Sequence, residues 1–197
     1  MAHGAGADMR HPFLETLAAL LAESNIATLR YQFPYMEAGR KRPDPPNLLE
    51  ATVRSVVEFA LSQDEGLPLL AGGKSMGGRM TSRAAAARPL PGVRGLVFLG
   101  FPLHPPGRPG AGRAEHLFGL DLPMLFLQGT RDRFAQLDLL QHVCERLGEQ
   151  ATLQLVEGGD HSFGVLKRSG RTQDEVMAEL AEGISDWAGQ FSGRFGA

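Results

Sequence analysis

The amino-acid sequence predicts an α/β fold, in which a mostly parallel sheet carries helices on both faces. Short apolar runs of strand length alternate along the chain with longer segments whose apolar residues recur at helical spacing. The run at residues 122–127 is nearly all apolar, as expected for a strand buried on both faces. With 197 residues, of which 43% are hydrophobic, the chain can bury a substantial core, and we expect residues 1–197 to form a single domain.

The predicted elements alternate regularly along the chain. Pro12 is expected to be the first residue of the first helix, because its fixed φ suits that position. Asn47 with Glu50, and Thr172 with Glu175, form capping-box patterns at the start of two further helices. The predicted strands are residues 27–33, 68–72, 93–100, 122–127 and 151–156. The predicted helices cover residues 12–21, 47–60, 134–147 and 172–191, and another runs through residues 84–87.

Charge and cysteine content exclude several classes of protein. Twenty Lys and Arg residues against 22 Asp and Glu residues give a net charge of −2, so no overall field attracts nucleic acid or an anionic membrane. The basic run at residues 40–42 lies beside prolines and is interpreted as a solvated loop. Cys144 is the single cysteine, which excludes an intramolecular disulfide, and its helical pattern predicts a core position. The chain has neither a signal-peptide pattern nor a membrane-spanning run, so we expect a cytoplasmic protein.

A serine lies in the turn after the predicted strand at residues 68–72. Residues 73–77 read Gly-Lys-Ser-Met-Gly and match G-x-S-x-G, in which a strained turn exposes the hydroxyl of the serine, here Ser75. The pattern also arises by chance in a chain with 25 glycines, where it marks an ordinary loop. The strand before it and the helix after it favour the strained turn. Ser75 is therefore a candidate nucleophile.

Two partners for this serine follow at the ends of later strands. Ser75, Asp132 and His161 occur in the order serine, acid, histidine, and in parallel sheets such groups gather at the carboxyl ends of the strands. A serine hydroxyl attacks at neutral pH only when an imidazole accepts its proton, and a carboxylate must orient that imidazole. Asp160 and Asp121 are the competing acids. Asp160 adjoins His161 in sequence and Asp121 precedes its strand, so Asp132 is preferred.

Backbone amides are the expected donors to an oxyanion. The amide of Met76, directly after Ser75, should be one donor. The second should come from the His-Gly-Ala-Gly loop at residues 3–6, and we name Ala5. The alternative for this loop is a frayed chain end.

Other polar residues are candidates for substrate contact. Lys74, Arg79 and His104 are expected at the mouth of the cleft, where they would favour an anionic or polar substrate group, although each also fits an exposed structural side chain. Tyr35 and its neighbour Met36 fit either a pocket wall or the core. The Pro- and Gly-rich segment at residues 102–120 is a candidate for a short cap.

Six motifs stand out, at residues 3–7, 31–37, 72–79, 100–105, 129–132 and 159–163. Together they resemble a family of small α/β-hydrolases. These are related to the mammalian testis-expressed protein 30 and to the hydrolase-like domain of a chromatin acetyltransferase regulatory subunit. More distantly the chain is similar to dienelactone hydrolases, which use a cysteine where this chain has Ser75. The resemblance covers nearly the whole chain and implies an α/β-hydrolase fold with a Ser75, Asp132, His161 triad.

In one respect the chain departs from that family, because it is short at the N-terminus. The resemblance implies a strand before the loop at residues 3–6, lying between residues 27–33 and the strand that leads to Ser75. Without it, interior backbone groups would be unpaired, at a cost of about 1–3 kcal/mol each. We expect that the chain is a piece of a longer protein. The alternatives are direct pairing of the two flanking strands, or a partner chain that fills the gap.

The sequence thus predicts a serine hydrolase of esterase or thioesterase type, acting on a small carboxylic ester. No metal and no organic cofactor is expected, and neither is a nucleic-acid or membrane partner. The acyl chain, the leaving group and the oligomeric state are not fixed by the residues. The competing hypothesis is a hydrolase-fold interaction module that serves as a non-catalytic subunit of a larger assembly.

Overall fold

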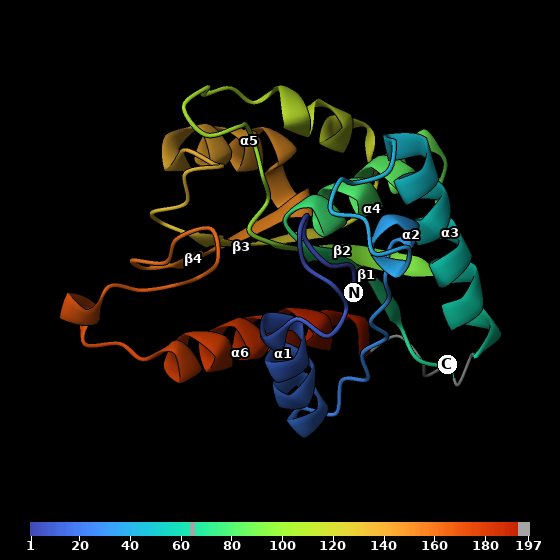
Figure 1. Cartoon of the computed structure of the whole chain (residues 1–197), viewed down its shortest axis with the longest axis horizontal. Coiled ribbons are helices and arrows are strands. Elements are labelled where there is room, and N and C mark those ends of the chain that lie inside the picture. The colour runs from blue at the N-terminus through green and yellow to red at the C-terminus, as the bar shows by residue number, and fades with distance from the viewer. Residues whose placement is uncertain (64–65, 193–197) are drawn as a thin grey trace.

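Four parallel strands form one sheet in the computed structural model of the chain, which describes residues 1–63 and 66–192 (Figure 1). The strands are neighbours in chain order: β1 (Leu69–Lys74), β2 (Val93–Leu99), β3 (Met124–Gly129) and β4 (Ala151–Val156). Because all four run in the same direction, their carboxyl ends meet at one edge of the sheet.

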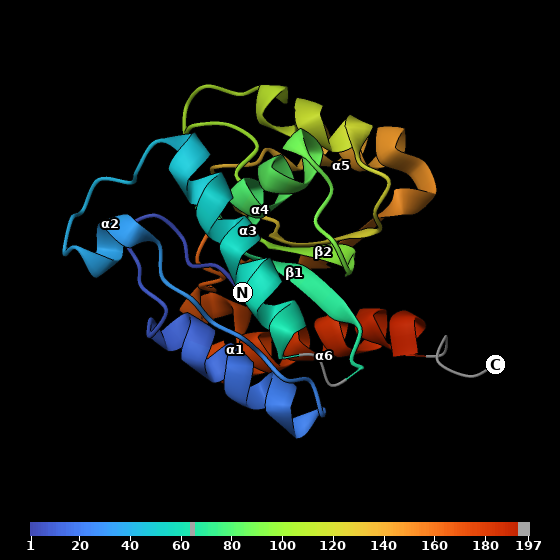
Figure 2. The same ribbon diagram turned by 90° about the vertical axis from the view of Figure 1, so that its right-hand side faces the viewer.

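Helices cover both faces of this sheet, as Figures 1 and 2 show. One face carries α3 (Pro46–Ser62), α4 (Met76–Ala87) and α5 (Leu137–Leu147). The other carries α1 (Pro12–Glu23) and α6 (Gln173–Ser192). The shorter helical turns are α2 (Pro34–Glu37), η1 (Gly112–Gly119), η2 (Gly148–Gln150) and η3 (Lys167–Ser169). The predicted fold class is confirmed. No helix within residues 1–63 and 66–192 has both the length and the apolar character needed to cross a membrane.

The apolar run in β3 divides its side chains between two cores. Met124 and Phe126 lie in the cluster under α3, α4 and α5, whereas Leu125 and Leu127 lie in the cluster under α1 and α6. Alternate residues of a strand point to opposite faces, so a strand covered on both sides must be apolar throughout. This is the physical reason for the pattern at residues 122–127.

The helix starts follow local signals in two cases and depart from them in a third. Pro12 is the first residue of α1. At α6 the capping box is present, because the Thr172 amide donates to Glu175 at 2.7 Å and the Glu175 amide donates to the Thr172 hydroxyl at 3.2 Å. The box predicted from Asn47 is wrong. The helix α3 begins one residue earlier, with Pro45 as the cap and no side-chain cap bond, and Glu50 instead pairs with Arg83 at 2.6 Å.

The strand predicted at residues 27–33 is also wrong, since only Tyr31 forms a bridge there. Its partner is Ala2, which bridges Tyr31 on one side and Gly73 on the other, both in parallel orientation. The Ala2 amide donates to the Gly72 carbonyl at 2.9 Å, and the Lys74 amide donates to the Ala2 carbonyl at 2.9 Å. Ala2 therefore separates residues 27–33 from β1, which contradicts direct pairing of these two segments. An extended segment becomes a strand only when a neighbouring segment pairs with it by hydrogen bonds along its length. Among the described residues, Ala2 is the one that forms a bridge with this segment.

Close approach of Ala2 to β1 makes Gly73 necessary. A Cβ on Gly73 would lie 2.2 Å from the Ala2 carbonyl oxygen, whereas a Cβ on Gly189, in α6, would meet nothing within 4 Å. Gly73→Ala should therefore lower the free energy of unfolding by at least about 2 kcal/mol. Gly189→Ala, the matched control, should raise it by about 0.5–1 kcal/mol, because alanine suits a helix interior better. Urea unfolding measures both, and a Gly73→Ala midpoint equal to wild type would contradict the packing described.

Candidate functional site

Ser75 lies in a sharp turn between β1 and α4. Its backbone is held at φ 50° and ψ −114°, a conformation that a non-glycine residue rarely adopts and that costs about 1–3 kcal/mol. The Ser75 amide donates to the Leu99 carbonyl at 3.0 Å, which anchors the turn to the end of β2. Gly77 completes the turn, because a Cβ there would lie 2.6 Å from the His3 carbonyl oxygen. The turn therefore presents the serine hydroxyl at the carboxyl edge of the sheet.

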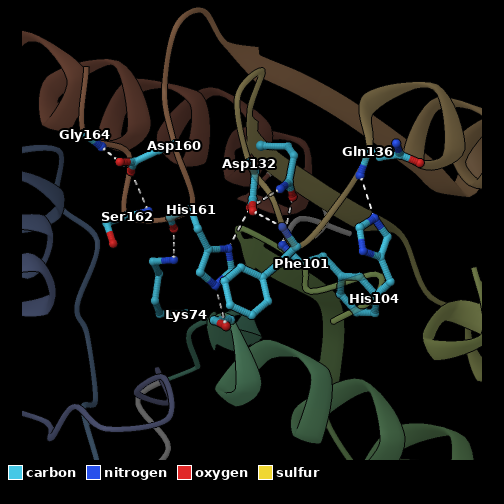
Figure 3. A network of polar contacts seen from close by, with 12 residues as sticks. Lys74, Phe101, His104, Asp132, Gln136, Asp160, His161, Ser162 and Gly164 are labelled. Carbon is cyan, nitrogen blue, oxygen red and sulfur yellow. Dashed lines mark hydrogen bonds and ion pairs between the residues drawn. The ribbon is translucent and has the colours of Figure 1, made fainter. Parts of the chain in front are cut away.

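The structure brings Ser75, His161 and Asp132 into one chain of hydrogen bonds (Figure 3). Nε2 of His161 lies 2.8 Å from the Ser75 Oγ, and Nδ1 lies 2.7 Å from the Asp132 Oδ2. Because the carboxylate can only accept, Nδ1 carries the proton and Nε2 is left to accept from the serine hydroxyl. The Asp132 side chain is fully buried, whereas the His161 side chain is 21% exposed. Asp132 thus fixes the orientation of the imidazole, while part of the His161 side chain remains accessible to solvent.

Two residues that the sequence motifs did not single out hold Asp132 and His161. Gln128 donates through Nε2 to the Asp132 Oδ2 at 2.5 Å and accepts from the Phe101 amide at 2.8 Å. The Phe134 amide donates to the Asp132 Oδ1 at 2.7 Å, and the Phe134 ring centroid lies 4.2 Å from that of His161. Three donors therefore satisfy the buried carboxylate. The signal for Gln128 in the sequence is its polarity within an otherwise apolar strand.

The two competing acids lie elsewhere. The Asp160 carboxylate accepts from the amides of Ser162 and Gly164 at 2.8 and 2.9 Å, and so closes the turn that carries His161 (Figure 3). Asp121 is exposed and precedes β3, at the opposite end of that strand. Asp132 is the acid in contact with the imidazole.

Lys74, which the sequence placed at the mouth of the cleft, is partly buried and contacts the loop that carries His161. Its Nζ donates to the backbone carbonyl of His161 at 2.5 Å (Figure 3), and lies 5.8 and 5.2 Å from the ring centroids of Phe13 and Phe163. Burial lowers the pKa of Lys74 to about 8, against the opposing effect of the Asp132 and Asp160 carboxylates. The residue before the serine thus supports the loop that carries the histidine.

His104, which the sequence also placed at the mouth, is buried. The residue is 3% exposed, and both of its ring nitrogens have partners. Nδ1 donates to the Pro105 carbonyl at 2.9 Å, and Nε2 accepts from the Gln136 amide at 3.0 Å (Figure 3). Its position beside a Pro-rich loop suggested an exposed side chain. Instead, its hydrogen bonds connect the segment after β2 to the start of α5.

The loop at residues 3–6 is ordered by His3. This side chain is buried, donates from Nδ1 to the Gly4 carbonyl at 2.9 Å, and accepts at Nε2 from the Phe33 amide at 3.1 Å. Burial lowers the pKa of His3, which keeps the ring neutral and able to accept. The alternative of a frayed chain end is therefore wrong for this loop.

The loop continues in a tight turn in front of Ser75. The Ala7 amide donates to the Gly4 carbonyl at 3.2 Å, and Gly6 has a φ of 76°, so the turn is of type II with Ala5 in its second position. A Cβ on Gly4 would lie 3.7 Å from the Ser75 Cβ, which places the loop beside the serine. Within the described part of the chain, neither the Ala5 amide nor the Met76 amide donates a hydrogen bond. Two amides near Ser75 thus have no protein acceptor.

Cys144 is a core residue, as predicted. It is 8% exposed in α5, and burial raises the pKa of its thiol to about 12. A thiol in that state has no nucleophilic role near neutral pH.

The stability of the protein should depend on pH through Lys74. Its pKa is about 8 in the folded state and 10.5 in the unfolded state, so between these values the unfolded chain holds a proton that the folded chain has released. The free energy of unfolding therefore increases as the pH rises from about 8 to 10.5. This gain is lost as the pH falls back through 8. Relative to Lys74→Met, wild type should gain on the order of 2 kcal/mol between pH 7 and pH 10.

Urea unfolding of both proteins at several pH values measures this gain. Lys167→Met, which removes an exposed lysine of η3, is the matched control and should show a constant difference from wild type. A difference between wild type and Lys74→Met that does not change with pH would contradict the buried position of the ammonium group.

Known proteins share this architecture. A dienelactone hydrolase from Anabaena variabilis has 20% identity and a TM-score of 0.74, with 96% of this chain and 83% of that chain covered. A serine hydrolase without a lid from Xanthomonas campestris has 22% identity and a TM-score of 0.70, with 94% and 81% covered. The esterase domain of a Rhodothermus marinus protein has 16% identity and a TM-score of 0.68, with 96% and 85% covered. At these identities the likeness concerns the fold. A family model described as alpha/beta hydrolase domain matches residues 1–189, and the chain therefore belongs to this family.

Proposed function

We propose that the protein is a serine hydrolase that cleaves a carboxylic ester or thioester of a small molecule. The observation that carries this proposal is the continuous chain of hydrogen bonds from Ser75 through His161 to Asp132. The family and the esterases among the similar solved structures support the same class of reaction. A neutral imidazole that accepts from a serine hydroxyl is the arrangement that acyl transfer requires.

The reaction proceeds through an acyl-enzyme. Ser75 Oγ attacks the acyl carbon while Nε2 of His161 takes its proton, and Asp132 stabilises the resulting imidazolium. The amides of Met76 and Ala5 donate to the oxyanion of the tetrahedral intermediate. His161 then gives its proton to the leaving alcohol or thiol, which departs. A water molecule, deprotonated by His161, then attacks the acyl carbon. His161 returns this proton to Ser75 Oγ as the acyl bond breaks, and the acid departs. These steps use only groups of the chain and water.

Labelling and kinetics of serine and acid variants test the proposal. Ser75→Ala should abolish labelling by a fluorophosphonate and lower kcat for a short 4-nitrophenyl ester by more than about 10⁴-fold. Asp132→Asn should lower kcat by about 10³- to 10⁴-fold, because an amide nitrogen facing Nδ1 favours the wrong tautomer of His161. Ser162→Ala, which removes an exposed serine beside His161, is the matched control and should label as wild type does. Equal rates in wild type and Ser75→Ala would refute the mechanism.

The role of Ala5 can be tested without disturbing the turn. Proline suits the second position of a type II turn, so Ala5→Pro removes the amide N–H and keeps the backbone path. We expect kcat to fall by about 10²- to 10³-fold with little change in KM and in melting temperature. Ala5→Ser keeps the N–H and is the control. A kcat for Ala5→Pro within twofold of wild type would show that another group binds the oxyanion.

The interaction-module hypothesis is decided by the same labelling experiment. If the folded protein neither labels with a fluorophosphonate nor hydrolyses any short ester, the hydrogen-bonded serine is idle. That result would favour a non-catalytic subunit over an enzyme.

A further inference from the structure

Three arginines gather where α4 meets η1 and α3. Arg79 and Arg83 lie in α4, and Arg113 lies at the start of η1. The carboxylate among them, Glu50 in α3, is paired with Arg83 at 2.6 Å. The Nε of Arg79 is buried and has no hydrogen-bond partner, and within residues 1–63 and 66–192 its guanidinium forms no ion pair. Arg79 is thus a partly buried cation without a counter-ion of its own.

The electrostatics of the cluster are unbalanced. Burial, Arg113 and Arg83 all lower the pKa of Arg79, and Glu50 alone opposes them. His116 of η1 adds no charge, because burial and the neighbouring Arg79 and Arg83 lower its pKa to about 4. Three positive charges therefore face one carboxylate, in a protein whose net charge is −2. An unpaired buried charge is costly, and the cost is relieved when an anion binds.

The cluster adjoins the reactive serine. Arg79 is one helical turn after Ser75, and its amide donates to the Ser75 carbonyl at 3.1 Å. Side chains of a helix lean toward its N-terminus, which here is the end that carries Ser75. On the other side, η1 packs against α4, and His116 lies 2.8 Å from the Ser82 hydroxyl. Arg79 therefore lies one helical turn from Ser75, in the helix that packs against η1, and η1 belongs to the segment that joins β2 to β3.

We propose that Arg79 and Arg113 bind a negatively charged group of the substrate, either a carboxylate or a phosphate, that is separate from the ester bond attacked by Ser75. This inference rests on the proposed function and narrows its substrate class to acyl esters that carry a negative charge. A guanidinium fork pairs two of its N–H groups with two oxygens of a carboxylate or phosphate, and Arg79 has unused donors. Arg113, from the facing element, completes the pair of cations.

A pair of matched esters tests the inference. The substrates are mono-4-nitrophenyl glutarate, which carries a terminal carboxylate, and its uncharged methyl ester. We expect wild type to favour the charged ester, and Arg79→Gln to lower its kcat/KM by about 10- to 100-fold while the uncharged ester changes less than twofold. Arg79→Lys should restore part of the preference. Arg168→Gln, which removes an exposed arginine of η3, is the control and should behave as wild type.

Competition separates the two kinds of anion. Glutarate and inorganic phosphate are compared as inhibitors of hydrolysis of the uncharged ester, and the stronger one identifies the group that the arginines prefer. Inhibition by that anion should weaken at least tenfold in Arg79→Gln. No preference for the charged ester in wild type, or equal losses on both esters in Arg79→Gln, would overturn the inference.

Failure of the proposed function gives a different result. In that case wild type hydrolyses neither ester and Ser75 does not label. Calorimetric titration of glutarate and phosphate into wild type and Arg79→Gln then tests the arginines alone. Binding to wild type that is lost in Arg79→Gln would support the anion site, and no binding to wild type would overturn it.

Discussion

The constraint on which the site depends is the close approach of the N-terminal residues to the serine turn. Ala2 exchanges backbone hydrogen bonds with β1, and His3 and Gly4 then pass directly over the start of α4. Gly73 and Gly77 permit this contact, because a Cβ at either position would overlap the backbone of residues 2 and 3. Ser75 lies between β1 and α4, beneath residues 2–4. The packing of these segments offsets the free-energy cost of its strained backbone.

A second set of contacts places the imidazole in front of that hydroxyl. The loop that carries His161 is closed by Asp160 and contains Phe163, a buried non-glycine residue with a φ of 62°. Lys74 links this loop to β1, since its Nζ donates to the carbonyl of His161 itself. The residue next to the serine in sequence therefore positions the histidine in space. Lys74 thus connects the backbone next to Ser75 with the backbone of His161.

Periodicity and local motifs predicted the elements whose environment the chain itself determines. Three patterns predicted their structure correctly: the apolar run in β3, the capping box at Thr172 and the glycine-flanked serine. In each case burial, capping or close approach restricts the residue types at positions that are near one another in the sequence. The errors arose where distant residues decide. Residues 27–33 have strand composition but lack a partner along most of their length. Asn47 has a cap sequence, but Pro46 already starts the helix and Glu50 pairs with Arg83.

The sequence by itself determined the α/β architecture, the turn that carries Ser75 and the order of its candidate partners, because these follow from patterns a few residues long. Only the tertiary structure decided that Lys74 bonds to the His161 carbonyl, that His104 bonds to the Gln136 amide, and that Gln128 and Phe134 support the acid. These assignments depend on which loops meet at the carboxyl edge of the sheet. The direction of a polar side chain is set there by whichever acceptor lies within reach, and that acceptor is often many residues away in the chain.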